Sequence, residues 1–214
     1  MTTRSGLILL ILVGLVALAF SPEDDDQPLN YSDLRLTQIA GKKLFVLKKC
    51  ADCHTLASKA QGKLTPVTNK RDDAWFKQHV QKESPIVLRR ATTSRRKRRV
   101  LKEELAALKD FLYGSTVRER VRIAEMPENI FEGAYLSYQN GCIKCHTIAG
   151  AGKDVGPDLT HIADKRGDKA WHIANLKDPQ QFHSDSPMPK FGGLGDEKLS
   201  LIADYLLTLR KPAK

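Results

Sequence analysis

The chain has 214 residues and a formal net charge of +10, from 35 Lys and Arg against 25 Asp and Glu. Its length allows two small domains and is too short for one very large core. Its four cysteines lie in two close pairs, which excludes a disulfide-stapled scaffold.

Residues 6–20 form an uninterrupted apolar run, preceded by Arg4 and followed by acidic residues at 23–26. The run is short for a membrane span, which needs about 20 residues. It suits the core of a signal peptide, with small residues at 17–19 for cleavage, and it equally suits a retained, tilted anchor. Both interpretations place the rest of the chain at the periplasmic or extracytoplasmic face of the membrane. A buried N-terminal helix is the third interpretation.

Residues 31–49 have a helix-like pattern and lead into Cys50-Ala-Asp-Cys53-His54. Cys-x-x-Cys-His is the attachment sequence of c-type haem. The two thiols add across the two haem vinyl groups, and the adjacent histidine becomes an axial ligand of the iron. The motif therefore predicts that Cys50 and Cys53 hold a haem covalently and that His54 binds its iron.

A second copy of the motif, Cys142-Ile-Lys-Cys145-His146, follows a helix-like segment at residues 128–140. The two copies use every cysteine in the chain. Paired Cys-x-x-Cys motifs also bind zinc, so a zinc or dithiol protein is an alternative. Two complete Cys-x-x-Cys-His motifs favour two covalently bound haems c.

The two motifs belong to a longer internal repeat. Residues 70–75 match 165–171 with one insertion, and residues 110–112 match 204–206. Two tandem domains of one fold explain this repeat better than one composite domain. The predicted division is a signal peptide or anchor with an acidic linker (1–29), a first domain (30–114), a linker (115–127) and a second domain (128–214).

Each copy is predicted to end in a helix. Apolar residues recur at helical spacing in both C-terminal segments, at Leu101, Leu105, Leu108 and Leu112 and at Leu199, Ile202, Leu206 and Leu209. Gly41 and Gly133 lie nine residues before the first cysteine of their motifs, inside the predicted N-terminal helices. A glycine in a helix interior costs about 1 kcal/mol relative to alanine. We therefore expect the two terminal helices of each copy to cross closely at this glycine.

With its motif, glycine and terminal helices, each copy resembles a class I c-type cytochrome domain, and the two cover nearly all of the chain beyond residue 30. The resemblance implies a mainly α fold with two tandem helical haem domains after the N-terminal hydrophobic segment. The second copy matches more closely. Its loop Gly156-Pro157-Asp158-Leu159 is similar to the family loop whose proline carbonyl accepts a hydrogen bond from the proximal imidazole, and residues 186–191 are similar to the loop that supplies the distal methionine. The resemblance thus implies His146 and Met188 as axial ligands, with Pro157 orienting His146.

The first copy departs from this pattern on the distal side of its haem. Pro66 corresponds to the proline of the second copy, but Ser94 stands where the second copy has Met188. Residues 30–114 contain no methionine. His54 is therefore the only iron ligand that the motif itself supplies.

Several groups are candidates for the second ligand of the first iron. His79 is the best internal candidate, and it is equally compatible with an exposed helical histidine. Met126 in the linker, a lysine such as Lys97, and a vacant or water-bound position are the alternatives.

An arginine and a tryptophan recur together in both copies, as Arg71 with Trp75 and Arg166 with Trp171. We expect them to contact haem propionates, which need cationic or hydrogen-bonding partners when partly buried. Helix-surface charge and core aromatics are the plainer alternative. The remaining histidines of the second copy are expected at the surface or behind the ligands, with the last as a fallback ligand: His161, His172 and His183.

The positive charge is concentrated in the first copy. Residues 30–120 hold 22 basic and 9 acidic residues, whereas residues 121–214 hold 12 of each. The basic run at residues 95–99 is compatible with a solvated helix start. It is also compatible with a patch that steers an acidic redox partner or anionic lipid headgroups. Export and haem argue against nucleic acid as a partner.

These features predict an electron-transfer protein and not an enzyme. A dihaem c-type cytochrome would act as a carrier or as a subunit of a respiratory complex, with redox proteins as partners and the membrane as a further partner if the N-terminal anchor is retained. The alternatives are a haem-based ligand-binding or sensing module and a dihaem peroxidase, either of which would use an open first iron.

Overall fold

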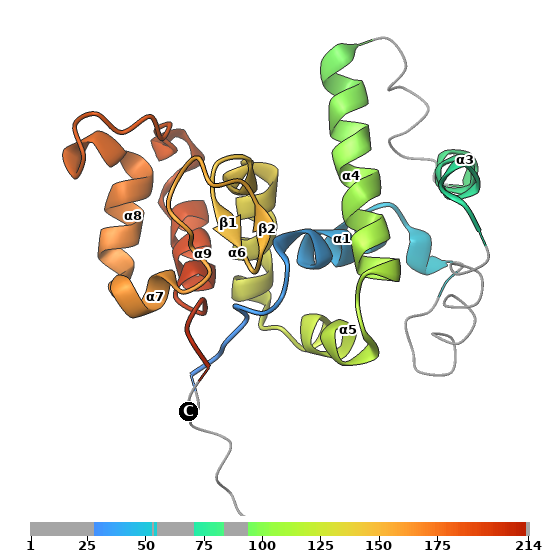
Figure 1. Cartoon of the computed structure of the whole chain (residues 1–214), viewed down its shortest axis with the longest axis horizontal. Coiled ribbons are helices and arrows are strands. Elements are labelled where there is room, and N and C mark those ends of the chain that lie inside the picture. The colour runs from blue at the N-terminus through green and yellow to red at the C-terminus, as the bar shows by residue number, and fades with distance from the viewer. Residues whose placement is uncertain (1–27, 53, 55–70, 84–93, 213–214) are drawn as a thin grey trace, which may run out of the picture.

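The computed structural model describes residues 28–52, 54, 71–83 and 94–212 of the chain. These residues are mainly helical, and two pairs of crossing helices form the centre of the molecule (Figure 1). None of the helices in these ranges is long and apolar enough to cross a membrane. The apolar run at residues 6–20 lies outside the described residues, so its role stays a prediction.

The first helix pair consists of α1 (Leu36–Leu47) and α4 (Arg95–Tyr113). At Gly41 an added Cβ would overlap the Ala107 carbonyl oxygen, so only glycine lets the two backbones approach this closely. Beside the crossing, the Phe45 and Phe111 rings pack edge to face with centroids 6.3 Å apart.

The second helix pair repeats this arrangement with α6 (Glu128–Gln139) and α9 (Asp196–Leu206). A Cβ at Gly133 would overlap the carbonyl oxygen of Leu201. The expected close crossing at a glycine is thus confirmed in both copies. Leu209 lies beyond the end of α9 but is still fully buried.

Shorter elements complete the fold. In chain order they are η1 (Cys50–Asp52), α3 (Asp73–Glu83), α5 (Val117–Ala124), η2 (Cys142–Lys144), β1 (Thr147–Ile148), β2 (Ala151–Gly152), α7 (Ile162–Lys165), α8 (Lys169–Lys177), η3 (Pro179–Gln181) and η4 (Gly192–Leu194). The strands β1 and β2 pair antiparallel, with Thr147 opposite Gly152. They follow the second Cys-x-x-Cys-His motif directly.

The segment expected as a linker contains the helix α5. Thr116 begins this helix with a capping box, in which its side chain accepts from the Glu119 amide at 3.2 Å and its amide donates to the Glu119 carboxylate at 2.6 Å. Ile123 and Met126 are buried. The linker is therefore packed against the core.

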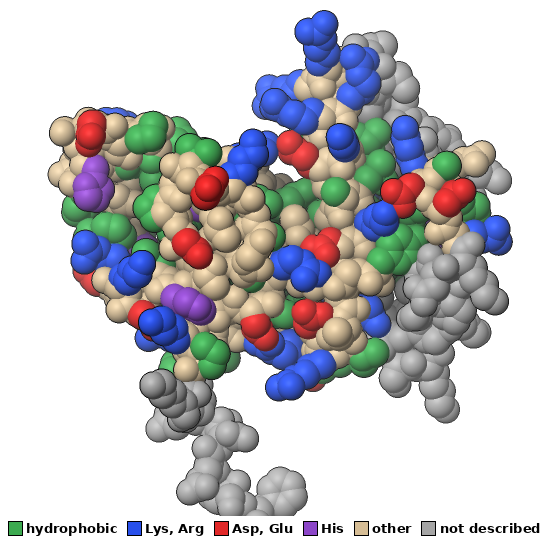
Figure 2. Space-filling view, in the orientation of Figure 1, with side chains coloured by type: hydrophobic (Ala, Val, Ile, Leu, Met, Phe, Trp, Pro, Cys, Tyr) green, Lys and Arg blue, Asp and Glu red, His purple; other side chains and the backbone are tan. Residues whose placement is uncertain are grey.

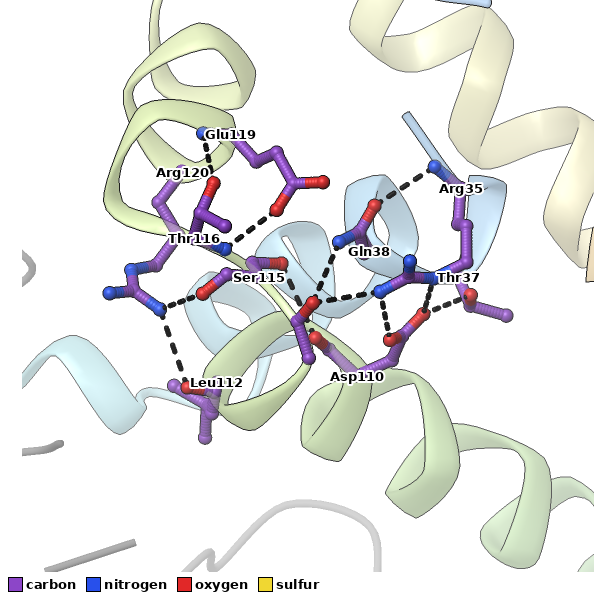
Figure 3. Close-up of polar contacts among 10 residues, drawn as sticks. Arg35, Thr37, Gln38, Asp110, Leu112, Ser115, Thr116, Glu119 and Arg120 are labelled. Carbon is purple, nitrogen blue, oxygen red and sulfur yellow. Dashed lines mark hydrogen bonds and ion pairs between the residues drawn. The ribbon is translucent and has the colours of Figure 1, made fainter. Parts of the chain in front are cut away.

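An ion-pair cluster joins the start of α1 to the end of α4 (Figure 3). Arg35 donates to both carboxylate oxygens of Asp110, at 2.7 and 3.1 Å, and to the Gly114 carbonyl at 2.8 Å. The hydrogen bond to Asp110 raises the pKa of Arg35. The matching residue of the second copy, Asp204, pairs with Lys169 of α8. The repeated aspartate therefore anchors the C-terminal helix in both copies.

The two copies contact one another through α1 and α6. Lys43 of α1 pairs with Glu132 and lies over the Phe131 ring, 5.4 Å from its centroid. A second contact joins Lys144, inside the second motif, to Glu103 of α4 at 3.2 Å. The attachment loop of the second copy thus lies against the first copy.

Candidate functional site

The second Cys-x-x-Cys-His motif opens onto a cavity of about 340 Å³. Gly141 ends α6 with a left-handed backbone (φ +74°) and turns the chain into the motif. Both cysteines, His146 and Met188 line this cavity. The remaining wall is largely apolar and includes Ile148, Leu159, Ile162, Trp171, Leu176, Phe191, Ile202 and Leu206.

His146 is oriented by the loop that follows β2. Its Nδ1 lies 2.7 Å from the Pro157 carbonyl oxygen. Because a carbonyl only accepts, Nδ1 carries a proton in this contact, and Nε2 is the ring nitrogen left to bind a metal. Gly156 lies so close to the ring that a Cβ there would be 2.7 Å from Cε1. The loop thus fixes the orientation of the His146 ring, as partners of metal-binding histidines do.

Met188 is held in the same cavity by hydrogen bonds to its loop. The Gln180 side-chain amide donates to the carbonyls of Ser186 and Met188, at 2.9 and 3.0 Å. After the loop, the Phe191 amide donates to the Leu176 carbonyl at 2.8 Å. Pro187 and Pro189 flank the methionine and restrict its backbone. No motif in the sequence pointed to Gln180, because its role depends on the folded path of the loop.

These residues fit a covalently attached haem. The cavity combines an apolar wall with two thiols, the imidazole of His146 and the thioether of Met188, and two further histidines also line it. Imidazole and thioether are the axial pair of high-potential c-type haems. Burial raises the pKa of the Cys142 thiol to about 11, so the side chain is neutral in the chain without haem. A neutral thiol is compatible with the apolar surroundings that a porphyrin also needs.

The repeated arginine–tryptophan pairs have the same geometry in both copies. Arg71 lies over the Trp75 ring at 5.1 Å from its centroid, and Arg166 lies over the Trp171 ring at 5.0 Å. Trp171 also lines the cavity. Contact of either arginine with a haem propionate stays a prediction.

The other histidines of the second copy differ in their surroundings. His172 is only 2% exposed, and its Nε2 lies 2.8 Å from the Arg166 carbonyl oxygen. Of the two places expected for His172, the surface and a position behind the ligands, burial excludes the surface; the residue lines the cavity and holds the backbone before α8. Burial lowers the pKa of His172. His183 is exposed and lines the edge of the cavity, whereas His161 is half-buried.

The first site is described only in part. Cys50 is half-buried in η1, and His54 follows it, whereas Cys53 and Pro66 lie outside the described residues. The His54 ring lies 5.9 Å from the His79 ring, centroid to centroid, and His79 stacks on Trp75 at 4.8 Å.

The alternative ligands of the first copy have different places in the fold. Ser94, which matches Met188 in the repeat, is the residue from which α4 begins. Met126 is buried just after the end of α5. The side chain of Lys97 lies outside the part of the chain that the structure describes.

Comparison with known proteins identifies the second copy. Residues 131–210 match the family model described as cytochrome c. The chain is 28% identical over 92 residues to the C subunit of nitric oxide reductase from Paracoccus denitrificans, which covers 39% of the chain and 61% of that protein. It is 28% identical over 99 residues to the equivalent protein of Stutzerimonas stutzeri, covering 42% of the chain and 65% of that protein.

A third relative is cytochrome c oxidase subunit 2 of Alkalihalophilus pseudofirmus, with 24% identity over 86 residues, 37% of the chain and 25% of that protein. The chain therefore spans between a quarter and about two thirds of the curated relatives that it matches. No solved structure matches the chain. The first copy lies outside the family match, so its assignment stays a prediction. Over residues 131–210, the chain carries a cytochrome c domain.

Proposed function

We propose that this protein transfers electrons through two covalently attached haems c, one in each repeat copy, at the periplasmic or extracytoplasmic face of the membrane. The observation that carries the proposal is the second site, where both motif cysteines, His146 and Met188 line one apolar cavity. The proposal of a haem in the first copy rests on the sequence motif and on the helix crossing that both copies share. No bond chemistry is assigned to the protein itself.

In the second site each side chain has a defined task toward the haem, which supplies reversible one-electron exchange when bound. With haem bound, His146 would offer Nε2 to the iron, and the Pro157 carbonyl fixes the ring. Met188 would offer its sulfur, and Gln180 fixes the backbone around it. The thioether favours the ferrous state and raises the potential. The apolar wall keeps water away from the ring.

The curated relatives favour a place near a membrane respiratory complex. Two of them belong to nitric oxide reductase and one to cytochrome c oxidase. We infer that this chain delivers electrons to, or within, a complex of this class, as a free carrier or as a subunit. Because these relatives are only 24–28% identical to the chain, the partner is to be identified by co-purification from solubilised membranes.

A basic surface on the first copy supports recognition of an acidic partner. Arg95, Arg96, Arg98 and Arg99 are exposed at the projecting start of α4, where Figure 2 shows basic side chains gathered. Cations are unfavourable at the positive end of a helix dipole, so the dipole of α4 does not stabilise them there, although Arg99 pairs with Glu103 at 3.9 Å. A cationic surface of this kind accelerates association with an anionic partner about tenfold or more at low salt.

Haem content is the direct test of the proposal. A pyridine haemochrome assay with intact mass spectrometry of the exported protein is expected to show two covalent haems per chain. Replacing Cys142 and Cys145 with serine should remove one haem, and replacing Cys50 and Cys53 should remove the other. A protein that binds zinc at these cysteines and no haem would overturn the proposal.

The basic surface has a test of its own. Replacing Arg95, Arg96 and Arg99 with glutamine should slow reduction by the donors in solubilised membranes about tenfold at low salt and little at high salt. The matched control replaces three lysines of the second copy with glutamine: Lys153, Lys198 and Lys211. Equal slowing in both variants would show that the basic surface does not recognise the electron donor.

A further inference from the structure

We propose that His79 is the second axial ligand of the first haem iron, so that this iron is held between His54 and His79. The inference rests on the proposed function, because it takes the first motif to carry haem. It adds a metal ligand in a helix that lies outside both motifs and outside the family match.

The repeat register places His79 on the side of α3 that faces the first motif. Both α3 and α8 begin two residues before their tryptophan, at Trp75 and Trp171. His79 follows its tryptophan by four residues, and the residue at the same place in α8 is Asn175. Trp171 and Asn175 both line the cavity of the second copy. Residues four apart share one helix face, so the matching face of α3 carries Trp75 and His79.

The two histidines of the first copy are already at a suitable separation. The His54 and His79 ring centroids lie 5.9 Å apart, with an angle of 67° between the ring planes. Since a metal–imidazole nitrogen bond is about 2 Å long, two imidazoles on opposite sides of one iron have ring centres about 6 Å apart. The fold therefore brings together two histidines separated by 25 positions at the spacing of a bis-imidazole site.

A stack of planar groups holds the His79 ring in place. The ring lies parallel to the Trp75 indole, with an angle of 5° and centroids 4.8 Å apart. Arg71 covers the indole at 5.1 Å. The second copy keeps the arginine and the tryptophan but has the amide of Asn175 in place of the imidazole. The two copies thus carry different donors: the second supplies Met188, and the first supplies His79.

Bis-imidazole ligation determines how the first haem behaves. Imidazole stabilises the ferric state more than a thioether does, so the first haem should have the lower potential. Electrons would then run downhill from the first haem to the second. With both axial positions filled, the first ferrous haem should not bind carbon monoxide.

The full-length protein with its haems attached tests the ligand set. The wild-type ferric protein should show a methionine–iron charge-transfer band from one haem only and a low-spin bis-imidazole EPR signal from the other. His79→Ala should lose that signal and gain binding of one carbon monoxide per chain, and added imidazole should reverse both changes. The control is Gln78→Ala, an exposed neighbour on α3 that should leave both spectra unchanged.

A second variant separates ligation from a purely structural role. His79→Met should produce a second methionine–iron band and raise the potential of the first haem. If His79→Ala keeps two attached haems and wild-type spectra, the assignment of His79 is wrong while the dihaem proposal stands. Carbon monoxide binding by the wild type, or two methionine–iron bands in its spectrum, would overturn the assignment in the same way. A wild-type protein with one haem, at Cys142 and Cys145 only, would instead overturn the proposed dihaem function.

Discussion

The two repeat copies share a scaffold and differ in the groups available to the iron. Each copy crosses its terminal helices at a glycine, anchors the C-terminal helix through an aspartate and stacks an arginine on a tryptophan. Only the second has a methionine loop, and only the first carries an excess of positive charge. The scaffold is constrained by close packing, whereas the methionine loop and the surface charge differ between the copies without disturbing it.

The copies also differ just before the motif. Gly141 precedes Cys142 with φ +74°, and Lys49 precedes Cys50 with φ +56°. A left-handed backbone is natural for glycine and strained for lysine. The first copy therefore keeps the turn into its motif with a less suitable residue, which shows that the turn itself is required by the fold.

The largest expected effect comes from making the second iron resemble the first. Met188→His should lower the potential of the second haem by a substantial part of the roughly 0.8 V range that axial ligands cover. The driving force between the two haems should then nearly vanish. Spectroelectrochemical titration of the full-length protein measures this, with the exposed Ser184→Ala as a control before the same loop. An unchanged potential would show that Met188 does not bind the iron.

The helix crossings provide the next test, with one variant in each copy. Gly41→Ala and Gly133→Ala should each destabilise the fold by about 1–3 kcal/mol, because the new Cβ meets a backbone carbonyl that cannot move without parting the helices. Chemical denaturation followed by circular dichroism checks this. Gly193→Ala is the control, since a Cβ there meets nothing within 4 Å. A large effect in only one copy would break the equivalence of the two scaffolds.

The stability of the second copy is expected to depend on pH through His172, whereas the matching residue of the first copy does not titrate. Burial lowers the pKa of His172, so the folded state favours the neutral ring and the unfolded state binds the proton more readily. This contribution to stability is complete above the unfolded pKa of about 6.5 and is lost as the pH falls below it. Each unit by which folding lowers the pKa of His172 corresponds to at most about 1.4 kcal/mol of stability.

The corresponding residue of the first copy is Phe76, which is also buried. His172→Phe should therefore flatten the stability of the second copy between pH 7 and pH 5. Thermal melts over this range measure the change, with His183→Ala as the exposed control. A wild-type stability that does not fall below pH 6.5 would contradict the buried neutral histidine.

The smallest effect is expected at the turn into the first motif. Lys49→Gly should stabilise the first copy by about 0.5–1 kcal/mol, since glycine relieves the left-handed strain but adds freedom to the unfolded chain. Gly141→Ala should destabilise the second copy by about 1–2 kcal/mol for the same reason. Equilibrium unfolding compares the two variants. Loss of stability in Lys49→Gly would mean that the lysine side chain outweighs its backbone strain.

Local sequence was enough to predict the glycine crossings, which the structure confirms, whereas covalent haem attachment stays a prediction. The Cys-x-x-Cys-His spacing is set within five residues, and a glycine repeated inside two helices has few explanations other than close packing. The His146–Pro157 contact also joins near neighbours along the chain, so the resemblance could anticipate it. The repeat can be recognised in the sequence because the matching residues of the two copies are separated by a nearly constant offset.

Tertiary structure alone decided the features that depend on distant residues. The burial of His172, the hydrogen bonds from Gln180 to the methionine loop and the packing of α5 arise from how separate elements meet. The meeting of His54 and His79 has the same origin: their side chains approach because α3 packs beside the first motif. The sequence alone determined that each copy has a haem motif. Which side chains lie near the histidine of each motif was decided by the fold, because His79 and Met188 come from segments that packing brings beside the motifs.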